Sequence, residues 1–218
     1  RLGVISDLGE MIFPDQLMMI FAQDVLSRNK GAKIIFDVKC SNLLSSTITN
    51  AGGQPVMSPT GHFHIKNALK ESGAPLAGEM SGHIFFNDIW YGFDDGHYSA
   101  FRLIEILSQH NKPLSNIFDG LPKAFSTPEI TIDVDENKKF GIVSSFVKNS
   151  VFPGGNKITI DGLRVNFPDG WGLLRASNTT PKLVLRFEAE TSERLSEIQS
   201  LFLTQLKEID ESIAVKLS

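Results

Sequence analysis

Residues 32–57 read AKIIFDVKCSNLLSSTITNAGGQPVM, and this stretch decides the fold. Residues 32–38 are rich in β-branched and aromatic side chains, residues 41–50 can form a helix, and residues 54–57 form a second short β-rich run. A strand, a helix and a strand in this order predict a βαβ unit, whose parallel strands are covered on both faces.

The same alternation continues on both sides of this unit. Before it, apolar residues recur at helical spacing over 14–29, and Pro14 suits a first helical turn. After it, the sequence predicts a helix over 62–71, a strand region over 75–86 and a helix over 96–109. The pattern therefore indicates a three-layer α/β domain of the βαβ type.

The pattern changes after a proline-rich stretch near residue 121, where we place a domain boundary. Beyond it, the sequence predicts strands over 129–134, 157–160, 163–167 and 183–189, and helices over 139–149 and 192–212. The pair Asp161-Gly162 lies between two alternating runs, which is a strong signal for a β-hairpin. We expect a smaller α+β domain with an antiparallel sheet.

Composition narrows the possible functions. The chain has 218 residues, of which 41% are hydrophobic and 21% charged, as in soluble globular proteins. Its net charge of −4 argues against nucleic acid or an anionic membrane as a partner. No apolar run reaches the roughly 18–20 residues of a membrane span. The single cysteine, Cys40, excludes an internal disulfide and a cysteine-rich zinc site, and it favours the cytoplasm.

The segment GEMSGH at 78–83 carries the most suggestive polar side chains. If the segment is extended, its period of two points Glu79, Ser81 and His83 to one side. A carboxylate, a hydroxyl and an imidazole on one side suit a polyol such as a sugar. The alternative is a polar strand edge with a glycine bulge.

The segment RASNTTP at 175–181 lies between two apolar runs and is expected to be a loop that joins two buried strands. Its guanidinium, hydroxyls, amide and backbone N–H groups can cradle a phosphate. The alternative is an ordinary polar turn, for which serine, asparagine, threonine and proline are well suited.

Two further positions lie where α/β proteins bind ligands. Lys39 ends a predicted parallel strand, and His62 in the segment TGH at 60–62 begins a helix. The alternative for Lys39 and His62 is a solvated or capping side chain. Asp94 and Asp95 precede a helix, and two carboxylates there are more typical of an N-cap than of a metal site.

Four motifs, taken in their order, resemble the bacterial phosphomannomutase/phosphoglucomutase enzymes of the α-D-phosphohexomutase superfamily. They are DVKC at 37–40, TGH at 60–62, GEMSGH at 78–83 and RASNTTP at 175–181. The resemblance spans essentially the whole chain but only about the second half of such an enzyme. We therefore expect the chain, which opens at Arg1, to be cut from a longer protein.

The resemblance implies a domain and residue assignment. Residues 1–10 would be the tail of the metal-binding domain 2, residues 11–121 the sugar-binding α/β domain 3, and residues 122–218 the phosphate-binding α+β domain 4. Glu79 and Ser81 would hold sugar hydroxyls. The residues expected to hold the phosphate that is not transferred are Arg175, Ser177, Asn178, Thr179 and Thr180. The residues expected to line the substrate and assist the reaction are Lys39, His62 and His83.

The activity that the resemblance implies for the full-length enzyme is the interconversion of hexose 1-phosphate and hexose 6-phosphate, for mannose and glucose, through a bisphosphate. Such an enzyme uses Mg²⁺ and a glucose 1,6-bisphosphate activator, and neither is expected to bind this chain by itself. The phosphoserine and the metal ligands are expected in the missing N-terminal domains. We expect the chain to be a monomer, inactive alone, whose partners are those domains and a hexose phosphate.

Two alternatives remain at this point. The first is the phosphoglucosamine mutase branch, which is disfavoured because those relatives usually carry glutamine at the position of Met80. The second is a stand-alone, non-catalytic module that binds a sugar phosphate.

Overall fold

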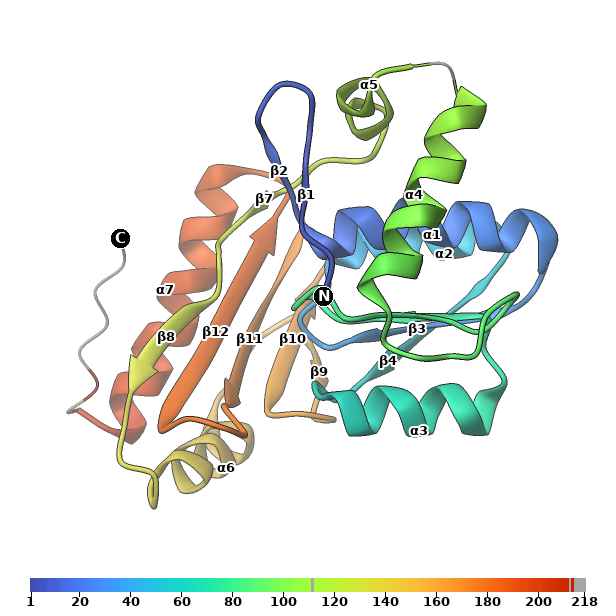
Figure 1. The fold of residues 1–218 in the computed structure, drawn as a ribbon. Coiled ribbons are helices and arrows are strands. Elements are labelled where there is room, and N and C mark those ends of the chain that lie inside the picture. Colours follow the sequence, from blue (N-terminus) through green and yellow to red (C-terminus); the bar gives the residue numbers. More distant parts are fainter. Residues whose placement is uncertain (111, 212, 214–218) are drawn as a thin grey trace. The chain divides into compact units, whose positions relative to one another are not determined.

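A computed structural model describes residues 1–110, 112–211 and 213 of the chain. The strand expected over 32–38 is present in it as β3 (Lys33–Asp37). The described chain divides into two compact units, Arg1–Pro122 and Lys123–Ser218. We describe each unit by itself (Figure 1).

Unit 1 is built on a four-stranded sheet in the order β4-β3-β5-β6. The strands β4 (Gln54–Ser58) and β5 (Leu76–Gly78) run parallel to β3 on either side of it. The last strand, β6 (Ile84–Phe86), is antiparallel to β5. The expectation of a parallel sheet is therefore wrong for β6, because only five residues separate it from β5 and a parallel return needs a crossover of a dozen or more.

Helices cover both faces of this sheet (Figure 1). On one face lie α1 (Pro14–Arg28), α2 (Asn42–Asn50) and α4 (Gly96–His110), and on the other lies α3 (His62–Ser72). Alternate residues of β3 account for the three layers, because Ile34 and Phe36 pack in the core with α1 while Ile35 packs with α3. Unit 1 also has an antiparallel pair, β1 (Val4–Ile5) and β2 (Met11–Ile12), and the short helix α5 (Leu114–Asp119).

Unit 2 is an antiparallel sheet with two helices on one face (Figure 1). Its strands run β7-β12-β11-β10-β9, and β8 also pairs with β12. The bounds of these strands are β7 (Phe125–Ser126), β8 (Ile130–Asp133), β9 (Asn156–Ile158), β10 (Leu163–Phe167), β11 (Gly170–Ala176) and β12 (Lys182–Ala189). The helices are α6 (Lys139–Asn149) and α7 (Ser192–Ile209). The mixed α/β class expected from the sequence is confirmed.

Several boundaries differ from those expected. The proline-rich stretch near residue 121 holds α5, although prolines and glycines there predict only a connection. The last helix ends at Ile209 rather than near 212, and residue 212 lies outside the described residues. The hairpin expected at Asp161-Gly162 is confirmed by the antiparallel pairing of β9 with β10.

The N-cap of α7 provides a test of local stability. The Thr191 hydroxyl accepts a hydrogen bond from the Arg194 amide at 3.1 Å. Thr191→Ala should therefore lower the free energy of unfolding by about 1 kcal/mol, measured in urea. Ser200→Ala, on the exposed side of the same helix, is the control and should leave stability unchanged or slightly raised. Equal stability of Thr191→Ala and the unchanged chain would show that the cap contributes nothing.

Candidate functional site

Polar side chains gather at the carboxyl ends of the three parallel strands of unit 1. Asp37 ends β3, Ser58 ends β4, and Glu79 directly follows β5. These ends lie at one edge of the sheet, which is where open α/β sheets bind ligands.

Asp37 organises this edge, and the sequence analysis did not single it out. Its Oδ1 accepts hydrogen bonds from the Met80 amide at 3.1 Å and from Cys40 Sγ at 3.1 Å. Its Oδ2 accepts from the Thr60 hydroxyl at 3.3 Å and lies 3.9 Å from Lys39 Nζ. One fully buried carboxylate thus holds three connecting segments together. The available signal was its place beside Lys39 at a strand end.

Lys39 is buried, with 6% of its surface exposed, so the alternative of a solvated side chain is wrong. A buried ammonium needs a compensating charge nearby. Asp37 supplies one, and the charge of Lys39 in turn favours the ionised form of Glu79.

The segment at 78–83 is a tight turn and not an extended strand. The Glu79 amide donates to the His83 carbonyl at 2.9 Å, and the Gly82 amide donates to the Glu79 carbonyl at 3.0 Å. Gly82 adopts a φ of 87°, which favours glycine. The chain must reverse here because β5 and β6 are antiparallel. The argument that a period of two aligns Glu79, Ser81 and His83 is therefore wrong, and Ser81 lies half-buried within the turn.

The Glu79 carboxylate is buried against the start of α3. Its Oε1 accepts a hydrogen bond from the Gly61 amide, the N-cap residue of that helix, at 2.8 Å. Burial raises the pKa of Glu79, and the nearby charge of Asp37 raises it further. These effects outweigh the hydrogen bond from Gly61 and the positive charge of Lys39, so the pKa of Glu79 lies above its ordinary value.

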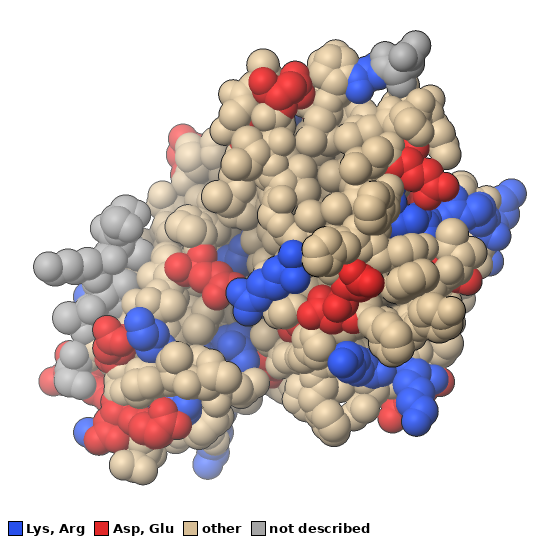
Figure 2. Space-filling model, viewed as in Figure 1, with Lys and Arg blue, Asp and Glu red and all other residues tan. Residues whose placement is uncertain are grey.

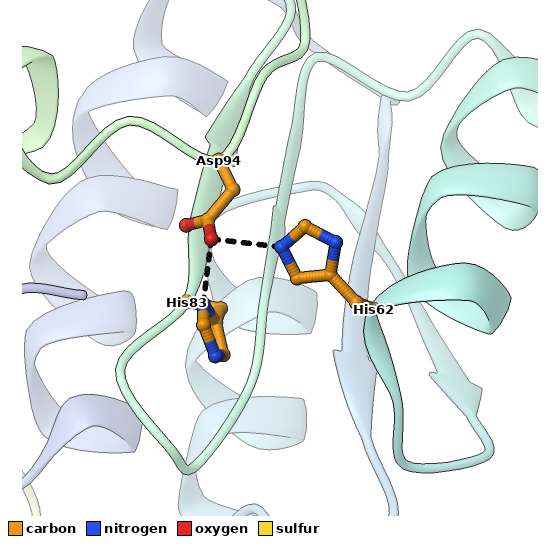
Figure 3. A group of neighbouring side chains, drawn as sticks. All are labelled: His62, His83 and Asp94. Atoms are coloured by element: carbon orange, nitrogen blue, oxygen red, sulfur yellow. Dashed lines mark hydrogen bonds and ion pairs between the residues drawn. The ribbon is translucent and has the colours of Figure 1, made fainter.

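His62 and His83 meet at Asp94 (Figure 3). Asp94 Oδ2 lies 2.7 Å from His62 Nε2 and 2.6 Å from His83 Nδ1. Arg1 Nε donates to the other nitrogen of His83, Nε2, at 3.0 Å. Burial by itself would raise the pKa of Asp94, but the hydrogen bonds from the two histidines hold it below its ordinary value.

Only one of the two adjacent carboxylates acts as the expected N-cap. Asp95 Oδ1 accepts from the Tyr98 amide at 2.9 Å, in the first turn of α4. Asp94 turns instead toward the histidines. The sequence could not show this grouping, because 32 residues separate His62 from Asp94.

Two imidazoles and a carboxylate within 4.8 Å of one another can also be considered as a metal site. Magnesium prefers oxygen ligands, so two nitrogens do not suit it. In addition, Arg1 can only donate, so His83 Nε2 must accept and the ring proton must lie on Nδ1, the atom that a metal would need. We therefore describe the group as a hydrogen-bonded triad, the His62–Asp94–His83 triad.

In unit 2, Arg175 lies within β11 and is 5% exposed. The expectation that it belongs to an exposed loop is wrong, because β11 stays buried and paired with β12 through Ala176 before the chain turns. Arg175 Nε donates to Asp161 Oδ2 at 2.9 Å. Its Nη2 is buried and, among the described residues, has no hydrogen-bond partner.

Gly162 allows Asp161 to approach Arg175 so closely. Gly162 has a φ of 73°, and a Cβ there would lie 2.2 Å from the Leu174 carbonyl oxygen. No other residue fits this turn without moving β11. The Asp161-Gly162 turn therefore brings a carboxylate to Arg175 as well as reversing the chain.

The remainder of the segment at 177–181 is a polar turn. The buried Ser177 hydroxyl accepts from the Thr180 hydroxyl at 2.8 Å and from the Thr180 amide at 3.2 Å. Asn178, Thr179 and Thr180 are exposed. The structure thus forms two groups, one in each unit: Lys39, His62, Glu79, Ser81 and His83 in unit 1, and Arg175 with residues 177–180 in unit 2.

The surface seen in Figure 2 has basic and acidic side chains interspersed over its described residues. None of the described helices is both long enough and apolar enough to cross a bilayer.

The fold and these groups define an α/β protein with polar side chains gathered at the ends of its strands. Comparison with known families identifies it further. Residues 13–125 match the phosphoglucomutase/phosphomannomutase alpha/beta/alpha domain III, and residues 129–205 match the C-terminal domain of the same family. The chain belongs to the phosphoglucomutase/phosphomannomutase family, which confirms the resemblance found in the sequence.

Individual proteins agree with this family. The chain is 54% identical to a phosphomannomutase/phosphoglucomutase of Pseudomonas aeruginosa, over 99% of this chain and 46% of that protein. A crystal structure of a family protein from Burkholderia thailandensis has 47% identity and a TM-score of 0.92, over 99% of this chain and 46% of that one. The chain therefore spans about half the length of these relatives.

A more distant structure shares the fold alone. The Aspergillus fumigatus N-acetylphosphoglucosamine mutase, solved with GlcNAc-6P and magnesium, has 10% identity and a TM-score of 0.68 over 95% of this chain.

Proposed function

We propose that this chain is the sugar-binding and phosphate-binding part of a phosphohexomutase, which interconverts hexose 1-phosphate and hexose 6-phosphate of mannose and glucose through a bisphosphate. The observation that carries the proposal is the match to two domains of one family, each with its own polar group. A substrate that binds in two orientations needs fixed contacts for the features that both orientations share.

In unit 1, Glu79 and Ser81 would accept and donate hydrogen bonds to the sugar hydroxyls. Lys39 is a buried cation near Glu79, and it would balance negative charge from the substrate. His62 and His83 would assist the proton transfer that accompanies attack by a hydroxyl, since an imidazole gains and loses a proton near neutral pH.

In unit 2, Arg175 and the polar turn at 177–180 would hold the phosphate that is not transferred. Support comes from Arg175 Nη2, which has no hydrogen-bond partner among the described residues and so keeps its donors for an anion, and from the exposed turn that follows Arg175 in the sequence. A guanidinium can hold two phosphate oxygens at once.

Magnesium and a glucose bisphosphate activator would act in the longer parent protein. Among the described residues, the His62–Asp94–His83 triad is the group of titratable side chains whose ligand atoms lie close enough together to hold a metal, and its two nitrogens do not suit Mg²⁺. We therefore assign magnesium and the phosphoserine to segments of the parent outside this chain, and we derive no step through the metal. We also place the protein in the cytoplasm as a monomer.

This chain by itself should show no mutase activity, because phosphoryl transfer needs the donor serine and a metal that neutralises the developing charge. The measurement is turnover of glucose 1-phosphate and mannose 1-phosphate with Mg²⁺ and glucose 1,6-bisphosphate. The full-length parent is the positive control and should convert both sugars.

Three other results would contradict this proposal. Turnover that copurifies with the chain alone would show that it is not the accessory half of the enzyme. Conversion of glucosamine phosphate only would assign the parent to the other branch. Binding of sugar phosphates by a natural protein of this length, without turnover, would favour a binding module.

A further inference from the structure

We propose that Asp94 is a positioning residue, which gives His62 and His83 opposite tautomers and thereby presents His83 Nε2 as the ring nitrogen that takes a proton from the substrate. This inference rests on the proposed function for the presence of such a substrate. The assignment of the tautomers rests only on the hydrogen bonds of the described residues.

The tautomer of His83 follows from its two neighbours. Arg1 Nε, 3.0 Å from His83 Nε2, is a donor and has no lone pair to offer. His83 Nε2 must therefore accept, so the proton of the neutral ring lies on Nδ1. That Nδ1–H donates to Asp94 Oδ2 at 2.6 Å.

The tautomer of His62 is the reverse. An ionised carboxylate can only accept, so His62 Nε2, 2.7 Å from Asp94 Oδ2, must carry a proton. One oxygen thus receives an N–H from each histidine, by Nδ1 of one ring and by Nε2 of the other. Their rings stand edge to face, with centroids 4.9 Å apart.

Asp94 is held well enough to fix this arrangement. The backbone of Asp94 forms an isolated antiparallel β-bridge with Phe85, the middle residue of β6. The two histidines hold its pKa below the ordinary value, so the carboxylate stays ionised at neutral pH. By contrast, the Arg1 side chain is exposed and can leave His83 Nε2 at small cost.

His83 is therefore arranged to act as a base at Nε2. When Nε2 takes a proton, the imidazolium that forms already donates its Nδ1–H to a negative oxygen, which stabilises the charge. The charged and titratable groups that face His83 are Asp94, His62, Glu79 and Arg1. Of these, Asp94 alone accepts from the ring.

Nitrogen-15 NMR of the labelled chain tests the assignment without any enzymatic activity. Two-bond proton–nitrogen correlations report the tautomer of each of the five histidines, and His83→Gln identifies the signals of His83. We expect Nδ1–H for His83 and Nε2–H for His62. In Asp94→Asn, the Nδ1–H fraction of His83 should fall toward that of the exposed His97 in the same spectrum.

The matched control is Asp95→Asn, the same chemical change one residue away, in which asparagine can still cap α4. It should leave both tautomers unchanged. Asp94→Ala is a second variant that offers no side-chain acceptor. A His83 that is mainly Nε2–H in the unchanged chain would overturn the proposal, as would an unaltered Nδ1–H fraction in both Asp94 variants.

Kinetics of the full-length parent test the role in the reaction. Asp94→Asn should lower kcat about tenfold, with KM within twofold, because the imidazolium that forms on His83 loses its hydrogen-bonded negative partner. An unchanged kcat, or a loss confined to KM, would contradict the role of Asp94 as positioning residue. A parent without mutase activity would instead refute the proposed function, while the NMR result would still decide the tautomers.

Discussion

Arg175→Ala in the full-length parent should lower kcat/KM for glucose and mannose phosphates alike by about 2 kcal/mol or more, roughly thirtyfold. Arg175 would hold the substrate phosphate in either orientation, so kcat/KM should fall equally for both sugars. Arg175→Lys should recover only part of the loss, because a point charge cannot hold two oxygens in the geometry of a guanidinium. Steady-state kinetics on both substrates is the measurement.

The burial of Arg175 adds a second effect. Removing a guanidinium that is 5% exposed removes the ion pair between Arg175 and Asp161, so the free energy of unfolding should fall by about 1–3 kcal/mol. The double variant Arg175→Ala with Asp161→Ala should regain much of this stability and none of the activity. That separation distinguishes phosphate binding from folding.

Arg194→Ala is the matched arginine control in unit 2. Arg194 pairs with Asp169 and Glu197 at the start of α7, and its side chain is partly exposed. Its loss should change kcat/KM little. If the activity of Arg175→Ala falls only in step with its stability, or stays intact, the segment at 175–181 is a structural turn and the phosphate is held elsewhere.

Glu79→Ala in the parent should lower kcat/KM for glucose and mannose phosphates by about 1.5–3 kcal/mol, roughly tenfold to a hundredfold. Hydroxyls shared by glucose and mannose would lose a charged acceptor. Glu79→Gln keeps the shape and an acceptor for the Gly61 amide but removes the charge, so its loss should be smaller. Unchanged kinetics in Glu79→Ala would place the sugar away from this carboxylate.

Glu79 should also leave a signature in the pH dependence of unfolding of the chain. Its pKa is raised in the folded state, so the folded state binds this proton more tightly than the unfolded state. The stability from Glu79 is present below its ordinary pKa and is lost as pH rises through the raised value. As the pH rises from 4 to 8, the free energy of unfolding of Glu79→Gln should therefore increase relative to that of the unchanged chain. A constant difference across that range would contradict the raised pKa.

Much of the fold followed from patterns that act over short distances. The apolar run around β3 predicts a buried strand, and the Asp161-Gly162 pair predicts the hairpin that β9 and β10 form. The two-residue strands β2 and β7 were not readable, because two residues show no period. Their pairing depends on partners elsewhere in the chain.

The site shows where such reasoning ends. GEMSGH and RASNTTP contributed to the resemblance that the family match confirms, but the extended geometry assumed for GEMSGH was wrong, and the loop expected over RASNTTP begins only after Ala176. Glu79 begins a turn because β6 returns beside β5, and Arg175 belongs to β11 because the strand is longer than its apolar residues indicate. The roles of these residues, and the sugar and phosphate assignment of the two units, stay predictions.

Contacts between distant segments were beyond the sequence. Asp37 and Asp94 each hold side chains or amides from segments far along the chain. A spare carboxylate beside a capping one, as at Asp94 and Asp95, is the kind of signal that can be sought in such a sequence.

The alternation along β3 limits how this protein can change over evolution. Ile35 and Asp37 lie on the same face of the strand, while Ile34 and Phe36 lie on the other. Inserting or deleting one residue within β3 would turn Asp37 into the apolar layer under α1 and at the same time expose an aliphatic side chain to the polar edge. Changes in chain length can therefore be absorbed only in the connections that flank the strand, and the polar edge can diversify only by substitution.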